Sequence, residues 1–336
     1  MSNIVLELKN VNKTYKKGRG KTSQEVVRAA QNVSLKLEKQ HIVSLVGESG
    51  SGKTTLARLI TGVEEPDSGT IFFEGKSIEH PRGKALFEYR RKVQMIFQDP
   101  FSSINPLNTI SYTLQRPLMN YLGASKKNVL NQVRELLDVV NLSPVDDYIG
   151  KLPYELSGGQ LQRVGIARAL ASQPNLIIAD EPVSMLDVSI RAEILNLLDD
   201  LRTNQGVSLI YITHDLVSAR ALADEIVVLY RGKVVEHGPS AEVARHPKHP
   251  YTELLLGSIA DPWRRREEIV PIEITSSPTP NGGCVFRHRC PLATDRCAEA
   301  SPQLVEVEAR HSVACFLHSD EEEDFVGGAL SGTTRN

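Results

Sequence analysis

The stretch Gly47–Thr54, which reads GESGSGKT, matches the pattern G-x-x-x-x-G-K-[ST] of a phosphate-binding loop, or P-loop. An apolar run over residues 42–46 precedes it, and helix-compatible residues follow it up to Ile60. Glycines allow the backbone N–H groups of such a loop to wrap around an anion, and the following helix adds the positive end of its dipole. This order of strand, glycine loop and helix makes a chance Gly/Ser turn a poor explanation. The stretch therefore predicts a site for a nucleoside triphosphate.

The side chains of this loop have the chemistry that a triphosphate requires. Lys53 is expected to reach the β- and γ-phosphates, and the Thr54 hydroxyl is expected to bind Mg²⁺. The residues expected to contact ATP in this stretch are Gly47, Ser49, Gly50, Ser51, Gly52, Lys53, Thr54 and Thr55.

Two carboxylates, Asp180 and Glu181, directly follow a second apolar run over residues 176–179. A continuous apolar run is typical of a parallel strand that is buried on both faces. Open α/β sheets bind their ligands at the carboxyl ends of such strands. In isolation the two residues would be a solvated acidic pair. Beside a P-loop, Asp180 is interpreted as holding Mg²⁺, directly or through water, and Glu181 as polarising the attacking water.

The remaining apolar patterns predict a doubly wound α/β fold with an inserted helical subdomain. A third buried strand is expected at 208–212, and helices are expected over 129–140 and 190–201. Residues 99–170 have a mainly helical pattern and lie between two core strands. The other expected segments are short strands of an N-terminal sheet at 4–8 and 33–37, a polar loop at 16–24, and a disordered acidic tail at 319–336.

The composition of the chain indicates where in the cell the protein is expected to act. The chain has 336 residues and a net charge of -2, which gives no field that would attract nucleic acid. No apolar run approaches the roughly 18 residues needed to span a bilayer, and the N-terminus lacks a secretory signal pattern. We therefore expect a cytoplasmic protein whose membrane role, if it has one, depends on partner subunits.

The segment Leu156–Gln160, which reads LSGGQ, identifies the family. Over residues 4–240 the chain resembles the ABC ATPases, whose hallmark is this pentapeptide. The resemblance implies a mixed sheet, an antiparallel N-terminal β subdomain and a head-to-tail dimer of two ATPase subunits. Ser157 and the amides of Gly158 and Gly159, with Gln160, would close on ATP that is held by the opposite P-loop.

Further positions match the family pattern in order. The resemblance implies that Tyr15 stacks on adenine and that His214 contacts the γ-phosphate. It also implies that Gln98 senses Mg²⁺ and faces the transmembrane partner. Asp187 would lie in the loop that crosses the dimer interface, where Met185 replaces the more usual alanine. Taken alone, these residues would be interpreted as packing, surface or capping residues.

The C-terminal region, residues 241–318, contains the stretches His249–Thr252, Gly283–Phe286 and Arg289–Pro291. With these stretches it resembles the extension of the dipeptide/oligopeptide permease ATPases. The long loop after Tyr15 and the segment Phe97–Pro100 resemble those of the second ATPase of such pairs. The region contains all four cysteines, Cys284, Cys290, Cys297 and Cys315. Four thiolates suffice for tetrahedral Zn²⁺ or for a [4Fe–4S] cluster, and the chemistry alone leaves both open, beside four free thiols. The permease resemblance favours the cluster, with His288 and His311 as substitute ligands.

The resemblance implies an ATPase on the cytoplasmic face of the membrane that energises an importer for peptides or related solutes. Its expected partners are a second ABC ATPase subunit, two transmembrane permease subunits and, indirectly, an extracellular solute-binding protein. An alternative is a soluble ABC-class ATPase of DNA repair or translation. The single cassette and the absence of basic bias argue against it. A third alternative is a redox- or metal-sensing module with vestigial hydrolysis.

Overall fold

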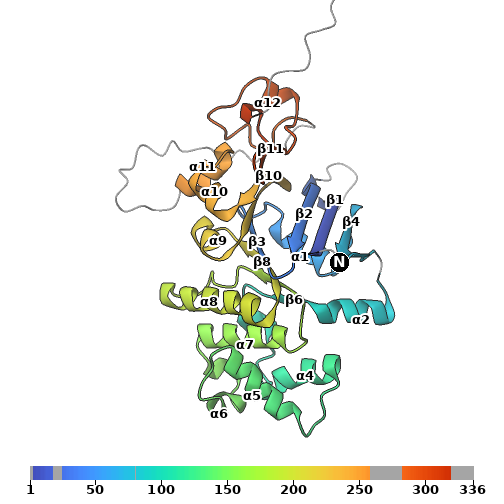
Figure 1. Ribbon diagram of the computed structural model, residues 1–336, viewed down its shortest axis with the longest axis vertical. Helices are drawn as coiled ribbons and strands as arrows, with labels where there is room; N and C mark the ends of the chain where they lie inside the picture. The colour runs from blue at the N-terminus through green and yellow to red at the C-terminus, as the bar shows by residue number, and fades with distance from the viewer. Residues whose placement is uncertain (1–2, 18–24, 80, 258–281, 319–336) are drawn as a thin grey trace, which may run out of the picture.

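The structure, a computed structural model, describes residues 3–17, 25–79, 81–257 and 282–318. Within these residues an eight-stranded mixed sheet forms the centre, in the order β11-β12-β10-β9-β3-β8-β7-β6 (Figure 1). Strands β9, β3, β8, β7 and β6 are parallel, and β10, β12 and β11 continue the sheet in antiparallel pairs. The strands are β3 (Ile42–Val46), β6 (Val93–Ile96), β7 (Leu176–Asp180), β8 (Ser208–Thr213), β9 (Glu225–Tyr230), β10 (Lys233–Pro239), β11 (Val305–Glu308) and β12 (His311–Val313).

The central strands β3, β7 and β8 confirm the three buried strands that the apolar runs predict. Every residue of the three is buried. Alternate side chains enter two separate hydrophobic clusters. Ile177 and Leu209 pack towards α7 and α8, whereas Ile178 and Ile210 pack towards α1 and the N-terminal strands. Burial on both faces explains why these runs are continuous and not alternating.

A second, antiparallel sheet has the order β2-β1-β4-β5, formed by β1 (Ile4–Lys17), β2 (Glu25–Glu38), β4 (Ser68–Phe73) and β5 (Lys76–Ser77). Strands β1 and β2 are much longer than the predicted 4–8 and 33–37. The predicted loop at 16–24 is wrong at its start, because Lys16 pairs with Val26, and residues 18–24 lie outside the described ones. Near the end of this ribbon the consecutive residues Val26 and Val27 are both exposed, so the backbone pairing continues without the apolar pattern that marks a buried strand.

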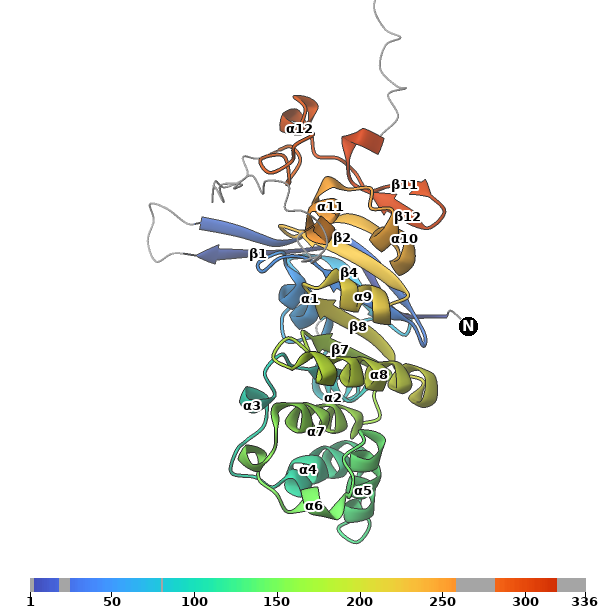
Figure 2. The same cartoon turned by 90° about the vertical axis from the view of Figure 1, so that its left-hand side faces the viewer.

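Helices cover the sheets and form the inserted subdomain (Figure 2). Helices α3 to α7 occupy one end of the molecule and lie in sequence between β6 and β7, as the helical pattern of 99–170 predicts. The helices are α1 (Lys53–Ile60), α2 (Gly83–Lys92), α3 (Pro100–Ser103), α4 (Ile110–Leu122), α5 (Val129–Val139), α6 (Asp146–Ile149), α7 (Gly158–Leu170), α8 (Val188–Gln205), α9 (Leu216–Leu222), α10 (Ser240–Arg245), α11 (Pro250–Gly257) and α12 (Arg296–Glu299).

The C-terminal region is joined to the main sheet. In register, β12 pairs Val313 with Glu236 of β10, so the sheet crosses the predicted domain boundary near residue 240. A third hydrophobic cluster lies here and includes Tyr230, Tyr251 and Phe286. The predicted acidic tail, 319–336, lies outside the described residues. Among the described helices, none has the length and apolarity that crossing a membrane requires.

Candidate active site

The P-loop connects β3 to α1, and two of its glycines are required by close backbone contacts. A Cβ added to Gly47 would lie 2.2 Å from the carbonyl oxygen of Leu229 in β9. A Cβ added to Gly52 would lie 2.1 Å from the carbonyl oxygen of Ala29 in β2, and Gly52 has φ +109°. No larger residue fits either position without moving a strand. The tip of the loop, Ser49 and Gly50, is exposed.

Two buried polar side chains of the loop suit an anionic ligand. The Lys53 ammonium, only 6% exposed, donates to the carbonyl oxygens of Gly47 at 2.6 Å and Glu48 at 3.0 Å. Burial lowers the pKa of Lys53, while nearby carboxylates act in the opposite direction. The Ser51 hydroxyl is buried and has no hydrogen-bond partner among the described residues. A phosphate would supply an acceptor to both groups, so these residues fit the predicted triphosphate.

Asp180 and Glu181 lie at the carboxyl end of β7, beside the P-loop. Burial and, secondly, the charge of Glu181 raise the pKa of Asp180, whereas a hydrogen bond from Thr54 and the charge of Lys53 lower it. A buried carboxylate next to a threonine hydroxyl is a fitting pair of oxygen ligands for Mg²⁺. The structure thus brings Asp180 and Thr54 together, as the sequence predicts.

Two predicted residues, Gln98 and His214, converge on the carboxylate of a third, Glu181. The Gln98 amide, on the segment after β6, donates to Glu181 Oε2 at 3.0 Å. The His214 Nδ1 atom, after β8, lies 3.3 Å from Glu181 Oε1. Glu181 itself has φ +45°, a left-handed conformation that costs a non-glycine residue free energy and often marks a functional site. The ends of three adjacent parallel strands therefore orient one glutamate between an amide and an imidazole.

Tyr15, near the end of β1, lies beside α1. Its hydroxyl hydrogen-bonds Glu64 and also interacts with the Thr55 side chain. Burial raises the pKa of the Tyr15 phenol, so the ring is neutral. This places an aromatic ring next to the helix that follows the P-loop. Stacking on adenine remains a prediction.

The signature segment lies apart from the P-loop of the same chain (Figures 1 and 2). Ser157 caps α7: its hydroxyl accepts from the Gln160 amide at 3.3 Å, and the Gln160 side chain accepts from the Ser157 amide at 3.0 Å. Gly158 and Gly159 form the first turn of α7, and a Cβ added to Gly159 would lie 2.7 Å from Ile190. Asp187 precedes α8 without a side-chain cap bond. One chain therefore does not bring the two phosphate-binding segments together.

Comparison with known proteins decides the family. The model of the ABC transporter family matches residues 30–184, and that of the oligopeptide/dipeptide transporter C-terminal region matches residues 235–297. The chain is similar to the probable peptide ABC transporter ATP-binding protein y4tS of Sinorhizobium fredii, with 42% identity over 95% of this chain and 91% of that protein. The oligopeptide transport ATP-binding protein AppF of Bacillus subtilis is 40% identical over 94% of this chain and 98% of its own length.

The chain belongs to the ABC transporter ATP-binding proteins of the oligopeptide/dipeptide type. Among solved structures, it resembles the dimeric ATP-binding cassette MJ0796 bound to ADP and Pi, with 34% identity and a TM-score of 0.62. That match covers 70% of this chain and 98% of the cassette. The prediction of an ABC ATPase fold is confirmed, and this ABC ATPase is a transport ATPase. Neither alternative, in DNA repair or translation or in sensing, gains support from these relatives.

The predicted metal site of this ABC ATPase finds no support in the geometry. Cys284, Cys290, Cys297 and Cys315 are free thiols that line one cavity of about 440 Å³. Among the described residues, however, no group of three or more His, Cys, Asp or Glu side chains is arranged to hold a metal ion. Burial raises the pKa of Cys284 and Cys290, and that of Cys315 to about 11. Burial thus disfavours the thiolate form of these three cysteines.

The two substitute ligands lie elsewhere. Neither His288 nor His311 lines the cysteine cavity. The His311 Nε2 atom lies 2.8 Å from Glu236 Oε1, and both side chains are almost fully buried. The role of His311 as a substitute ligand stays a prediction: its Nε2 atom bonds a buried carboxylate, and its Nδ1 atom has no hydrogen-bond partner among the described residues.

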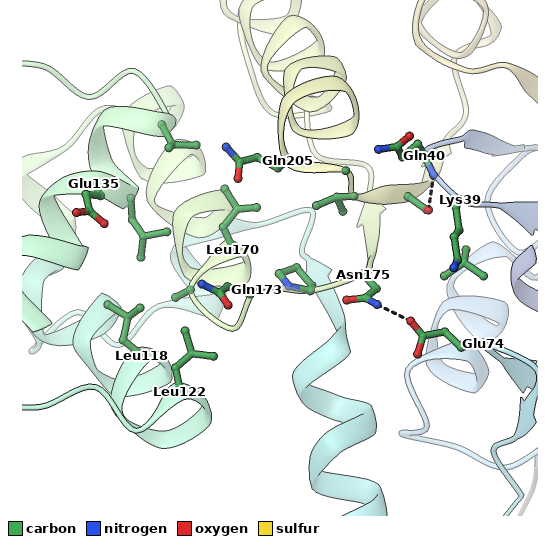
Figure 3. A pocket seen from close by; sticks show the side chains of 18 of the residues that line it. Lys39, Gln40, Glu74, Leu118, Leu122, Glu135, Leu170, Gln173, Asn175 and Gln205 are labelled. Carbon is green, nitrogen blue, oxygen red and sulfur yellow. Dashed lines mark hydrogen bonds between the residues drawn. The ribbon is translucent and has the colours of Figure 1, made fainter. Parts of the chain in front are cut away.

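A separate cavity of about 830 Å³ lies at the opposite, amino ends of the parallel strands (Figure 3). It is lined by residues of the helical subdomain, such as Leu122, and by Gln173 and Asn175 before β7. Asn175 hydrogen-bonds Glu74, whose pKa is lowered by this bond and by the Lys92 ammonium against the effect of burial. No P-loop residue lines this cavity, so it is distinct from the ATP site.

Sequence reasoning missed two residues that touch the P-loop. Arg289 and Tyr251, from the C-terminal region, both bond Glu48. Both lie in stretches that carry the permease resemblance, but nothing local in those stretches points to Glu48, from which they are separated by 203 and 241 residues. Only the folded chain brings them together.

Proposed function

We propose that this ABC ATPase binds and hydrolyses ATP to drive the import of peptides or related solutes. The convergence of Gln98 and His214 on Glu181, beside the P-loop, carries the proposal for hydrolysis. The match to the oligopeptide/dipeptide transporter C-terminal region, and the names of the relatives, support the class of solute.

In the proposed reaction, Glu181 accepts a hydrogen bond from the attacking water and polarises it towards the γ-phosphate. Gln98 and His214 hold the two carboxylate oxygens, so one orientation of Glu181 is selected before water arrives. Lys53 leaves the loop carbonyls and moves its charge to the phosphates. When bound by Thr54, Asp180 and Gln98, Mg²⁺ would neutralise charge on the phosphate oxygens. The products are ADP and phosphate.

The active unit in this proposal is a head-to-tail pair of two ATPase subunits, which are non-identical. Each P-loop would face Ser157–Gln160 and the Asp187 loop of the other subunit. The separation of the two segments within one chain supports this arrangement, as does the dimeric state of the related cassette MJ0796. Met185 in the same loop is 63% exposed and would be covered by the second subunit.

The segment after β6 is the proposed contact with the membrane subunits. Phe97, Phe101, Leu107 and Tyr112 are large apolar side chains that are 44%, 53%, 85% and 47% exposed. Exposed apolar residues grouped in this way are typical of an interface with another protein. Two permease subunits would dock here, at the cytoplasmic face of the membrane, and a solute-binding protein would act indirectly from the outside. Movement of this segment would reach Glu181 through Gln98.

The substitution Glu181→Gln tests hydrolysis. It removes the charge that polarises water while keeping the shape of the side chain. We expect steady-state ATPase activity to fall by at least about 100-fold, with binding of a non-hydrolysable ATP analogue retained. Glu135→Gln, an exposed carboxylate on α5, is the matched control and should retain activity. Undiminished turnover in Glu181→Gln would refute the role of Glu181.

A metal at the four cysteines is a finer proposal. The four thiols line one cavity without being arranged for a metal, so a [4Fe–4S] cluster, or Zn²⁺ as the alternative, would bind only if the thiols moved and became thiolates. Anaerobic purification followed by iron, sulfide and zinc analysis and a visible spectrum tests it. Brown protein with about four irons would support the cluster. Colourless protein with one zinc would support Zn²⁺, and protein free of both would refute a metal role.

A further inference from the structure

The C-terminal region holds Glu48, the second residue of the P-loop, by two independent contacts. The Arg289 guanidinium donates in bidentate fashion to Glu48, at 2.7 Å to Oε2 and 2.9 Å to Oε1. The backbone N–H of Glu48 donates to the Tyr251 hydroxyl at 2.9 Å. A side chain and an amide of the phosphate-binding loop are thus both held by residues that follow the ABC core in sequence.

The two residues that contact Glu48 are held by an aromatic cluster, to which Tyr251 belongs and on which Arg289 packs. The rings of Tyr230, Tyr251 and Phe286 pack together, with centroids 4.6 to 5.4 Å apart. Tyr251 and Phe286 are 0% and 1% exposed. The Arg289 guanidinium lies over the rings of Tyr230 and Phe286, at 5.8 and 5.9 Å from their centroids. Its fork is therefore oriented before it meets the carboxylate, which reduces the entropy lost in pairing.

The backbone carbonyl of Glu48 forms hydrogen bonds within the P-loop. Its carbonyl oxygen accepts from the Ser51 amide at 3.2 Å and from the Lys53 ammonium at 3.0 Å. The amide, the carboxylate and the carbonyl of this one residue are all engaged. Displacing Glu48 would therefore release the first turn of the loop and the lysine together. A loop that has lost this order must be ordered by its ligand, at a cost in affinity.

We propose that Arg289 and Tyr251 are positioning residues that hold the P-loop in its phosphate-binding conformation, so that the C-terminal extension sets the nucleotide affinity of this subunit. This inference rests on the proposed ATP site, and it adds a function to the extension that does not depend on any metal. Cys290, which lines the cysteine cavity, directly follows Arg289 in the chain.

The experiment measures binding of a non-hydrolysable ATP analogue with Mg²⁺ to the full chain by calorimetry, together with thermal unfolding. Arg289→Ala and Tyr251→Phe are each expected to raise the Kd about tenfold, the effect of one well-placed polar contact. Arg289→Lys keeps the charge but not the bidentate fork, so it should recover part of the loss.

Arg287→Ala is the matched control within the same segment. The Arg287 guanidinium bonds the carbonyl oxygens of Gly282 and Ala298, inside the extension, and does not touch the P-loop. It should lower the melting temperature while leaving the Kd unchanged. Glu48→Ala tests the same pair from the P-loop side and keeps the extension intact if Arg289→Ala fails to fold. The double variant Glu48→Ala/Arg289→Ala should bind no more weakly than either single variant.

The inference is overturned if Arg289→Ala and Tyr251→Phe keep a Kd within about twofold of the parent. It is also overturned if Arg287→Ala weakens binding as much as Arg289→Ala, since the effect would then be general loosening of the extension. A parent chain that fails to bind the analogue would refute the proposed ATP site, and with it this inference. A parent chain that binds, beside unaffected variants, refutes the positioning role alone.

Discussion

Stability of this ABC ATPase should depend on pH through His249, which lies immediately before α11. Its ring is 1% exposed, and its Nδ1 atom accepts from the Tyr251 amide at 3.0 Å. Burial, with a smaller contribution from the charge of His318, lowers the pKa of His249 to about 4. Its pKa in the unfolded chain is about 6.5. Between these values the unfolded chain binds a proton that the folded chain does not.

The free energy of unfolding should therefore be unaffected by His249 above pH 6.5 and should fall as the pH falls towards 4. From pH 7 to pH 5 the loss is about 2 kcal/mol, and it approaches about 3 kcal/mol at the lower limit. A protonated ring would also lose the acceptor that caps α11, the helix that carries Tyr251. Acidification should thus loosen the C-terminal region first.

Urea unfolding followed by far-UV circular dichroism at pH 7 and pH 5 measures this loss. His249→Asn keeps an acceptor near the Nδ1 position and cannot titrate. The difference in free energy of unfolding between the parent and this variant should therefore be about 2 kcal/mol smaller at pH 5 than at pH 7. His246→Asn, on an exposed neighbour, is the control and should follow the parent. If the parent and His249→Asn lose stability in parallel, the assignment of the proton to His249 is refuted.

Two further substitutions test the geometry of the loop and of the extension. Gly52→Ala should abolish binding of an ATP analogue, because its Cβ would lie 2.1 Å from the Ala29 carbonyl, whereas Gly50→Ala meets no atom within 4 Å and should lose less. Glu236→Gln should lower the free energy of unfolding, measured in urea, by about 2–4 kcal/mol. The carboxylate bonds the Lys248 and His249 amides and the His311 ring, and the NH2 group of glutamine would face at least one of these donors. Glu253→Gln, exposed on α11, should not lower this free energy.

A specific outcome would refute each of these two predictions. Equal analogue binding by the Gly52→Ala variant and the parent would mean that β2 moves aside at no cost. A Glu236→Gln variant as stable as the Glu253→Gln control would mean that the buried carboxylate contributes nothing beyond its shape.

Much of the ATP site follows from the sequence because its determinants are local. The glycine pattern of residues 47–54 fixes the loop, and the continuous apolar runs fix the buried strands at 176–180 and 208–213. Carboxyl ends of parallel strands meet at one edge, so the approach of His214 to Glu181 could be anticipated. The expected contact of Ser157 with ATP on the P-loop of a second subunit involves two chains, and it stays a prediction.

The features that sequence reasoning missed depend on long-range packing. The pairing of β12 with β10 joins segments about 75 residues apart, and the short run Val305–Glu308, which reads VEVE, gives only a weak alternating signal. The bond between Glu48 and Arg289 has no local pattern at all. The clustering of the four cysteines in the sequence indicated a local site, but it could not decide whether the thiols are arranged for a metal.

The continuation of the sheet from β10 into β12 has a consequence for shortened forms of the protein. A chain that stopped at residue 240 would leave β10 as an open edge, because β10 would keep its pairing with β9 but lose its pairing with β12 at Glu236 and His237. Open edges of this kind recruit strands from other molecules and lead to aggregation. A chain shortened at residue 240 is therefore expected to aggregate more readily than the full chain.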